Sequence, residues 1–397
     1  MTRQIQDAYV VAAVRTPIGK APRGVFRNVR PDDLLAHAVR AAVDQLPGLD
    51  RKAIEDVVVG CAMPEGPQGL NVARIGLLLA GLPNSVGGIT VNRFCSSGLN
   101  AVSIAADRIR VGEAEVVVAA GTESMSMVPM TGFHPSFNDK IYTDENYGIA
   151  YGMGMTAERV ATQWKVSREA QDEFALTSHR RALAAQAEGA YTEIVPYTAS
   201  DRTPDLSGRQ IAARTRTVAQ DEGPRADTSA EALAKLRPVF AVKGSVTAGN
   251  SSQTSDGAGA LVLMSEAAMK RFGAAPLARF VAFSVAGVPP EIMGIGPKFA
   301  IPKALAAAGI RQDDLGWIEL NEAFAAQSLA VINDLGLDRA KVNPLGGAIA
   351  LGHPLGATGA IRSATLVHGL RRRKLKYGMV TMCVGTGMGA AGIFEAV

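Results

Sequence analysis

Cys95 is the residue of this sequence best placed for nucleophilic chemistry. It lies in residues 92–100, where a tight turn with apolar neighbours runs into a helical pattern. Unpaired N–H groups in the first turn of a helix, together with the positive end of the helix dipole, stabilise an anionic sulfur and can lower its pKa from about 8.5 toward neutral. We therefore predict a reactive thiolate here. The alternative is a small buried thiol that only packs, which is the commoner role of a lone cysteine.

Two further residues with useful chemistry stand in glycine-rich turns. His353 lies in residues 343–359, which carry too many glycines for a helix and too little bulk for a core strand. Such a turn is suited to presenting one imidazole as a base. Cys383 opens residues 383–389, where a thiol stands beside flexible backbone amides that could point at an oxyanion.

These residues must be positioned by the elements around them, and those elements repeat. The first and last 120 residues or so show the same alternation of strand-like and helical patterns, which is typical of an α/β sheet covered by helices. Residues 54–60 resemble 317–321, and residues 116–122 resemble 379–386. We interpret this as a duplication that gives two α/β halves about a pseudo-twofold axis. Chance similarity of α/β patterns is the alternative.

A duplicated fold also predicts where a ligand would bind. Ligands of such sheets gather outside the carboxyl ends of the strands, where loops from both halves meet. Cys95, Asn321, His353 and Cys383 all fall at loop positions of this kind. We therefore expect them to lie close together.

Residues 122–248 differ in composition from both halves. Methionines gather near glycines and prolines in the first part, and a charge-rich helical stretch and a polar segment follow. An inserted lid or loop domain fits this composition better than further sheet, and a flexible apolar surface suits an acyl chain. The predicted domains are an N-terminal half of residues 1–121 plus 249–275, a loop domain of residues 122–248 and a C-terminal half of residues 276–397.

Composition excludes several classes of function. The net charge of +4 is small for 397 residues, and no basic stripe is interleaved with aromatics, so we expect no nucleic-acid partner. The three cysteines form no CxxC pair and have no histidine at zinc-ligand spacing, so we expect neither a metal site nor a disulfide scaffold. No apolar signal core and no membrane-span-length apolar stretch is present, so we expect a cytoplasmic protein without membrane contact.

Four ordered motifs give the sequence a resemblance to the thiolases, a family of acyl-CoA C-acyltransferases, over nearly its whole length. They are residues 92–98 (NRFCSSG), 321–325 (NEAFA), 352–354 (GHP) and 383–387 (CVGTG). Each alone would be a weak signal, but their order and spacing together are specific. The resemblance implies the thiolase fold, in which two duplicated α/β halves form αβαβα layers with an inserted loop domain.

The resemblance also implies an activity. A thiolase of this kind cleaves a 3-ketoacyl-CoA with CoA, giving acetyl-CoA and a shortened acyl-CoA, as in fatty acid β-oxidation. Acyl-CoA and CoA would be substrates, and no cofactor would stay bound. Two acyl transfers through one cysteine imply ping-pong kinetics. The family further implies a homodimer or a homotetramer.

The resemblance assigns a role to each motif. Cys95 would attack the 3-keto carbonyl and carry the acyl group as a thioester, and His353 would take its proton. Cys383 would protonate the departing enolate and later deprotonate CoA. Asn321 would hold a water that forms one oxyanion site with His353. The N–H groups of Cys95 and Gly385 would form the other, around the tetrahedral intermediate.

Further residues match positions that contact CoA or the acyl chain in the family. Ser252 and Ala248 lie in a segment that is similar to the pantetheine-binding loop; without the resemblance, a Ser/Gly loop with no ligand would be preferred. Arg225 matches an arginine near the adenosine 3′-phosphate, where a guanidinium fork suits the charge. Phe324 and Met153 would line the acyl end of the pocket.

One departure bears on the substrate. Short-chain biosynthetic acetoacetyl-CoA thiolases commonly carry a histidine in the segment that here spans residues 151–158, and this sequence has Gly152 there. The missing bulk leaves room and removes a polar partner. It favours a degradative 3-ketoacyl-CoA thiolase of broader chain length, as does the run of residues 251–257. The biosynthetic type stays the alternative within the family.

Three interpretations outside that activity stay open. A ketoacyl synthase-like condensing enzyme shares the fold and the nucleophilic cysteine, but should bring a second active-site histidine where Cys383 stands. A non-catalytic acyl-CoA or lipid carrier would more readily have lost Cys95 or His353. A cysteine hydrolase explains neither Cys383 nor the duplicated halves.

Overall fold

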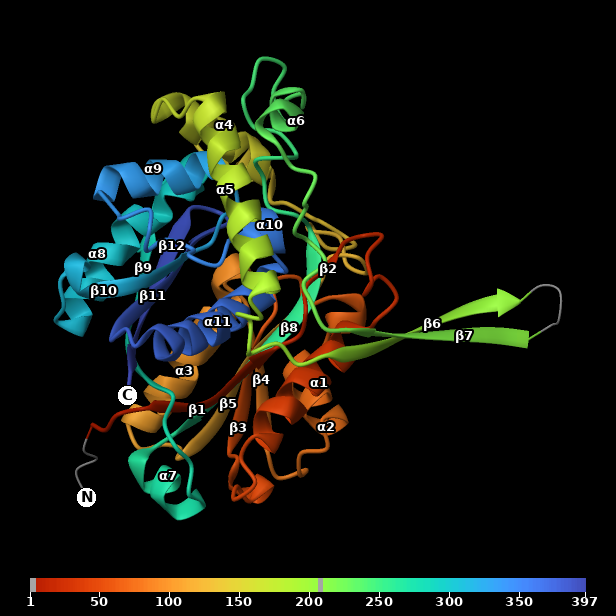
Figure 1. The fold of residues 1–397 in the computed structure, drawn as a ribbon, viewed down its shortest axis with the longest axis vertical. Helices are drawn as coiled ribbons and strands as arrows, with labels where there is room; N and C mark the ends of the chain where they lie inside the picture. The colour runs from red at the N-terminus through yellow and green to blue at the C-terminus, as the bar shows by residue number, and fades with distance from the viewer. Residues whose placement is uncertain (1–4, 206–209) are drawn as a thin grey trace.

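The molecule is built from alternating layers of helices and sheets (Figure 1). The computed structural model describes residues 5–205 and 210–397, with no side chains described for residues 201–214. Two helices form the middle layer, α3 (Ser97–Arg110) and α11 (Thr358–Arg373). One apolar core holds buried side chains of both helices and of strands from both halves. The predicted αβαβα arrangement is confirmed.

The N-terminal half contributes five neighbouring strands and a short extension. In spatial order the strands are β4 (Gly87–Val91), β3 (Asp56–Gly60), β5 (Val116–Ser124), β8 (Ser255–Met264) and β1 (Tyr9–Arg15), and β2 (Gly19–Lys20) pairs with β8. Strand β3 is parallel to β4 and β5, whereas β8 is antiparallel to β5 and β1. Every residue of β5 and β8 is buried, because helices cover both faces of the sheet.

The C-terminal half repeats this order. Its strands are β10 (Leu315–Leu320), β11 (Tyr377–Val384), β12 (Met388–Ala396) and β9 (Ala278–Gly287). Strand β10 is parallel to β11, and β12 is antiparallel to both of its neighbours. A parallel bridge between Ile318 and Val342 stands beside β10 as β4 stands beside β3. The matching order confirms the predicted duplication, and pairing of Val10 with Ala278 joins the two sheets.

The outer layers are helical. Helices α1 (Pro31–Asp44) and α2 (Val72–Leu79) cover the N-terminal sheet, and α8 (Gly296–Ala308) and α9 (Ala325–Leu335) cover the C-terminal one. Helix α7 (Glu266–Phe272) follows β8, and α10 (Ala348–Leu351) lies in the histidine turn. Helix α1 starts at a proline, whose fixed φ suits the first helical position, and has two acidic residues in its first turn that complement the helix dipole.

The middle helices position the cysteine turn. The apolar side chains that the helical pattern predicted in α3, Leu99, Val102, Ala106 and Ile109, are all fully buried. Burial of a Leu, Val or Ile side chain contributes roughly 1.5–3 kcal/mol. Helix α11 crosses α3 so closely that a Cβ on Gly359 would lie 2.0 Å from the backbone nitrogen of Leu99. The absence of a side chain at Gly359 therefore allows α3 and α11 to approach this closely.

Residues between the halves form a separate unit on the sheet ends. Helices α4 (Met153–Gln163), α5 (Arg168–Ala187) and α6 (Ala230–Ala234) lie together at the top of Figure 1. Strands β6 (Tyr197–Asp205) and β7 (Gln210–Val218) form a two-stranded hairpin that extends away from the body, which the composition did not predict. Among the described residues, no helix has the length and apolar character to cross a bilayer. The domain boundaries stay a prediction.

Candidate active site

Cys95 lies in a short 3-10 turn, Phe94–Ser96, that leads directly into α3. The turn is held by side chains on its own segment: the Phe94 N–H donates to Asn92 Oδ1 over 2.8 Å, and the Arg93 N–H donates to Ser97 Oγ over 2.9 Å. Cys95 itself is buried, with 9% of its surface exposed. The predicted place of the thiol at the start of a helix is confirmed.

The electrostatics of Cys95 differ from the prediction. Its pKa is raised to about 12, first by burial and to a lesser degree by the charge of Glu123. The N–H groups of Gly385 and of Cys95 itself point at the sulfur and lower the pKa, but less than burial raises it. The expectation of a thiolate with a lowered pKa is therefore wrong for this site. Cys95 rests as a neutral thiol, with the two predicted oxyanion donors directed at it.

His353 is presented by a strained glycine turn, as predicted. Gly352 has φ +105°, and a Cβ there would lie 2.3 Å from Ser255 Oγ, so a larger residue does not fit. The imidazole Nδ1 lies 2.7 Å from Thr358 Oγ1, and Nε2 lies 3.3 Å from Asn321 Nδ2. If the Asn321 amide donates to Nε2, the neutral ring carries its proton on Nδ1 and donates it to Thr358.

The imidazole is neutral. Its pKa is lowered to about 3, chiefly by burial and then by the Arg362 guanidinium. Asn321 is also buried, and its Oδ1 is an acceptor with no protein partner in the described part of the chain. That oxygen is free to hold a water, as the predicted role of Asn321 requires.

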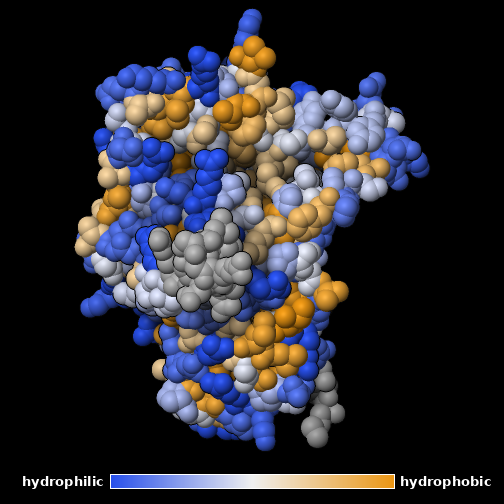
Figure 2. Space-filling view, turned by 90° about the vertical axis from the view of Figure 1, so that its right-hand side faces the viewer, coloured by the Kyte–Doolittle hydropathy of each residue, from blue (hydrophilic) through white to orange (hydrophobic). Residues whose placement is uncertain are grey.

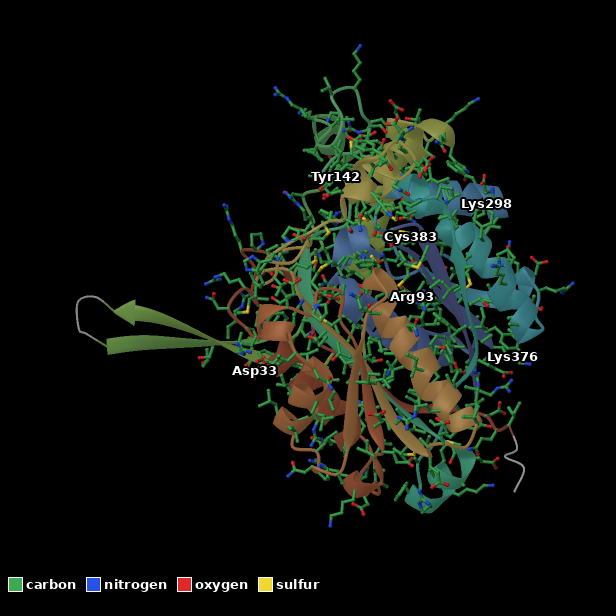
Figure 3. All side chains as sticks on the ribbon, turned by 180° about the vertical axis from the view of Figure 1, so that it is seen from behind. Asp33, Arg93, Tyr142, Lys298, Lys376 and Cys383 are labelled. Carbon is green, nitrogen blue, oxygen red and sulfur yellow. The ribbon has the colours of Figure 1, made fainter. Side chains whose placement is uncertain are left out.

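Cys383 comes from the other half of the molecule. It is the penultimate residue of β11 and is fully buried. Strand β11 contacts the 3-10 turn that carries Cys95, and Figure 3 shows Cys383 near Arg93, the residue before that turn. Burial, and then the neighbouring Cys95, raise the pKa of the Cys383 thiol. The two thiols therefore interact, although 288 residues separate them in the sequence.

A single cavity of about 380 Å³ brings these groups together. Its lining includes Cys95, His353 and Cys383, and also Ser252, Phe324 and Met153. The remaining walls are mostly apolar, and many of their residues come from the inserted segment. They include Met125, Met130, Gly152, Met155 and Phe240. Gly385 stands at the edge of this cavity, where its Cβ would lie 3.8 Å from Met153 Sδ.

A second cavity of about 350 Å³ is lined by Arg225 and Ala248, the two predicted CoA-binding residues that do not line the first cavity. Gln253 lines both cavities and so connects them. The Arg225 guanidinium pairs with Asp227 at 3.0 Å and is more than half exposed. The backbone N–H of Arg225 donates to Nδ1 of His179 over 3.2 Å.

Several polar residues at or beside these cavities were missed in the sequence, among them Lys20, His179 and Thr358. Lys20 and His179 line the second cavity, and the pKa of His179 is lowered to about 4 by burial, so it is neutral. Thr358 orients His353. Of Lys20, His179 and Thr358, only Thr358 could have been found from the sequence, because it stands five residues after His353 in the same turn. The other two are brought in by packing of β2 and α5, which no local pattern reveals.

The family comparisons agree with this geometry. The family model for the thiolase N-terminal domain matches residues 8–267, and that for the thiolase C-terminal domain matches residues 274–396. The chain belongs to the thiolase family. Its resemblance to thiolases, inferred from four motifs, is thereby confirmed over nearly the whole chain.

Named relatives of this thiolase chain cover it from end to end. It is 49% identical to a 3-ketoacyl-CoA thiolase of Bacillus subtilis (strain 168), over 98% of this chain and 100% of the relative. It is 46% identical to peroxisomal 3-ketoacyl-CoA thiolase A of Mus musculus, over 98% and 91% of the two chains.

Solved structures show the same fold. The acetyl-CoA acetyltransferase of Bacillus anthracis matches with a TM-score of 0.89 and 40% identity over 100% of both chains. The dimeric peroxisomal thiolase of Saccharomyces cerevisiae matches with a TM-score of 0.89 and 40% identity, over 99% of this chain and 98% of that one.

Proposed function

We propose that this protein cleaves 3-ketoacyl-CoA with CoA, as a degradative thiolase. One observation carries the proposal: two thiols and one imidazole from distant parts of the chain line one largely apolar cavity. Relatives named 3-ketoacyl-CoA thiolases, bacterial and peroxisomal, support the same activity. An acyltransferase needs this combination of nucleophile, base and acyl pocket.

In the first half-reaction, Nε2 of His353 takes the proton of Cys95 as the sulfur attacks the 3-keto carbonyl carbon. The oxyanion of the tetrahedral intermediate is placed between the N–H groups of Cys95 and Gly385. Collapse of the intermediate breaks the bond between the second and third carbons. The electron pair goes to the acetyl-CoA enolate, which takes a proton from Cys383. The acyl group stays on Cys95 as a thioester.

In the second half-reaction, the Cys383 thiolate takes the proton of the incoming CoA thiol, and the CoA sulfur attacks the thioester. Collapse expels the Cys95 sulfur, which regains its proton from His353. Cys383 and His353 thus both return to their starting states. Each N–H donor at an oxyanion contributes roughly 3 kcal/mol in comparable sites.

The neutral resting state fits this sequence of steps. Cys95 with a raised pKa and His353 with a lowered pKa exchange no proton before a substrate arrives. Proton transfer is then driven by the attack itself, since the developing negative charge moves from sulfur to the carbonyl oxygen. The largely apolar lining of the cavity also limits the access of bulk water to the thioester.

The second cavity supports the proposal that CoA binds here as a substrate. We propose that no cofactor stays bound. Ser252 and Ala248 stand where the pantetheine arm would pass, and Arg225 and Lys20 add positive charge for the phosphates. His179 would add a neutral ring beside them. Gln253, which lines both cavities, marks the path from the nucleotide end to Cys95.

Chain length separates the proposed function from its runner-up, a short-chain biosynthetic thiolase, which the likeness to an acetyl-CoA acetyltransferase favours. A Cβ on Gly152 would meet no atom within 4 Å, so the cavity keeps open space at this point. Gly152→Phe should lower kcat/KM for an eight-carbon 3-ketoacyl-CoA about tenfold or more and spare the four-carbon one. Wild-type rejection of every chain beyond four carbons would favour the biosynthetic type instead.

A dimer, or a dimer of dimers, is the assembly we propose. Strand β4 pairs only with β3 in the described structure, and Ile89 on it is 46% exposed. Leu78 and Leu79 of α2 are exposed as well, and Figure 2 shows apolar surface in the lower part of the molecule. A free edge beside apolar surface favours pairing with a second copy, and the yeast relative is dimeric.

We propose the cytoplasm as compartment, since all three cysteines are free.

The activity is tested by following the absorbance of acetoacetyl-CoA on addition of CoA. We expect CoA-dependent loss of the signal in the wild type and none with Cys95→Ser. Condensation that starts from a malonyl thioester without CoA would point to a ketoacyl synthase instead. Binding of acyl-CoA without turnover would point to a carrier.

A further inference from the structure

Glu123 is a buried carboxylate at the end of β5 that the reaction scheme does not use. Only 1% of its surface is exposed. Its Oε2 accepts hydrogen bonds from the N–H of Ala62 over 2.7 Å and of Gly356 over 2.8 Å. Its Oε1 accepts from the N–H of Met63 over 3.2 Å and from the side-chain amide of Gln68. Two backbone segments and the side chain of Gln68 therefore converge on one carboxylate.

One of these contacts leads to the catalytic histidine. Gly356 stands three residues after His353 in the same turn. The turn packs so closely on the neighbouring segment that a Cβ on Gly356 would lie 2.5 Å from the Ala62 nitrogen. Glu123 thus fixes the far end of the histidine turn, while Thr358 fixes the ring itself.

Another contact leads to the catalytic cysteine. The Ala62 carbonyl, one peptide away from the N–H that Glu123 holds, accepts from Asn92 Nδ2 over 3.0 Å. Asn92 Oδ1 in turn accepts from the N–H of Phe94, the residue before Cys95. A short chain of hydrogen bonds therefore runs from Glu123 to the cysteine turn.

The donors around Glu123 favour its ionised form. Four are N–H groups and the fifth is the Cys61 thiol, whose sulfur lies 3.9 Å from Oε1. A protonated carboxyl would present a hydrogen to at least one donor and lose that bond. Burial raises the pKa of Glu123 above its usual value, and the hydrogen bonds from Ala62, Gly356, Met63 and Gln68 offset only part of that rise. Burying a carboxylate costs free energy, which these donors offset while the side chain stays ionised.

We propose that Glu123 is a positioning residue for the reaction, whose carboxylate ties the cysteine turn and the histidine turn to one strand end and so sets how His353 faces Cys95. The inference rests on the proposed function, because it assigns Glu123 to the same nucleophile and base. A misplacement of about 1 Å between reacting groups can cost about 100-fold in rate.

The test compares turnover with the reactivity of Cys95 in Glu123→Gln. The variant keeps the shape but puts an NH₂ group against N–H donors, so we expect kcat to fall about 10- to 100-fold with KM for CoA unchanged. Because the Glu123 charge raises the pKa of Cys95, we also expect alkylation of Cys95 by iodoacetamide to become faster and to shift to lower pH. Disruption of the fold would also expose Cys95 and make it more reactive, so the result supports the proposal only if Glu123→Gln keeps the wild-type urea denaturation curve.

Two further variants sharpen the result. Glu123→Asp keeps the charge but shortens the reach, so turnover should fall while the pH dependence of alkylation stays that of the wild type. Glu158→Gln is the matched control, because Glu158 is a buried carboxylate that accepts from the N–H groups of Ser245 and Val246 in the inserted segment. It should leave the pH dependence of Cys95 alkylation unchanged.

The outcomes separate the two claims. Wild-type kcat in Glu123→Gln, or alkylation and turnover that fall together, would overturn the positioning role. Absence of thiolysis in the wild type would overturn the proposed function instead, and alkylation would still report on Glu123. If Glu123→Gln does not fold, Gln68→Met removes one of the four N–H donors, and unchanged kcat in that variant would count against the proposal.

Discussion

At the scale of single residues, the site combines groups that are all neutral at rest. Burial raises the pKa of both thiols and lowers that of the imidazole, so none of the three is charged at neutral pH. Reactivity must therefore come from geometry: the N–H groups of Cys95 and Gly385 point at the Cys95 sulfur, and in the proposed mechanism they also hold the oxyanion that forms beside it. The substrate carbonyl supplies the oxygen on which negative charge develops, so Cys95 loses its proton only as its sulfur attacks.

The resting state has a measurable pH dependence. Only the thiolate of Cys95 reacts with iodoacetamide, and its pKa is raised to about 12. The alkylation rate should therefore keep rising with pH up to at least about pH 10. The rate is measured as loss of free thiol on Cys95 by peptide mass spectrometry. A plateau below pH 8 would show that the thiol is already ionised and contradict this account.

Cys383 can be tested apart from Cys95. Cys383→Ala should lower the rate of thiolysis at least about 100-fold, because the enolate loses its proton donor and CoA its base. Acylation of Cys95 by an acyl-CoA should be slower but still detectable by mass spectrometry, since His353 still takes the Cys95 proton and CoA can leave as a thiolate without an acid. Full turnover in this variant would refute the scheme with two thiols.

At the scale of elements, the active site depends on how closely the middle helices cross. Gly359 of α11 lies against the first turn of α3, which directly follows Cys95. The cysteine turn and the histidine turn are therefore set by one helix pair. Two loops that arise far apart in the sequence meet because each opens a helix of the central layer.

This crossing predicts a stability cost. Gly359→Ala should lower the free energy of unfolding by about 1–3 kcal/mol, because its methyl group would meet the Leu99 backbone. Urea denaturation measures the change. Gly152→Ala is the control, since its methyl group meets no atom within 4 Å and should cost little. Equal stability of the two variants would contradict the close approach.

Much of this arrangement could be predicted from the sequence, because it follows from local patterns. The helical spacing of Leu99, Val102 and Ile109 predicted α3, and the glycines around His353 predicted its turn. The duplicated strand segments predicted that both would reach one edge. What could not be predicted depends on three-dimensional burial: the raised pKa of Cys95 and the place of Glu123, whose partners are distant in sequence.

At the scale of the whole molecule, the two duplicated halves join into one sheet, and each half contributes one of its two edges. The path of paired strands runs from β10 to β4, with β1 and β9 at the junction. The inserted segment then covers the catalytic end and supplies most of the apolar wall of the cavity. A second copy at β4 would extend the sheet further.

That assembly is open to a direct test. Ile89→Lys places a charge on the exposed edge and should shift the protein from dimer toward monomer, because pairing would bury the ammonium group. Sedimentation velocity measures the change, with Ile5→Lys as the control at another exposed isoleucine. A dimer of unchanged stability in both variants would place the interface elsewhere.

The central claim, that Cys95 carries the acyl group between two substrates, is tested most directly in the absence of free CoA. A 3-ketoacyl-CoA of eight carbons is mixed with excess enzyme, the reaction is quenched, and acetyl-CoA and the Cys95 peptide are quantified together. We predict one equivalent of acetyl-CoA per acylated enzyme, with a hexanoyl thioester on Cys95. Release of acetyl-CoA only after CoA is added, or acylation at another residue, would contradict the account.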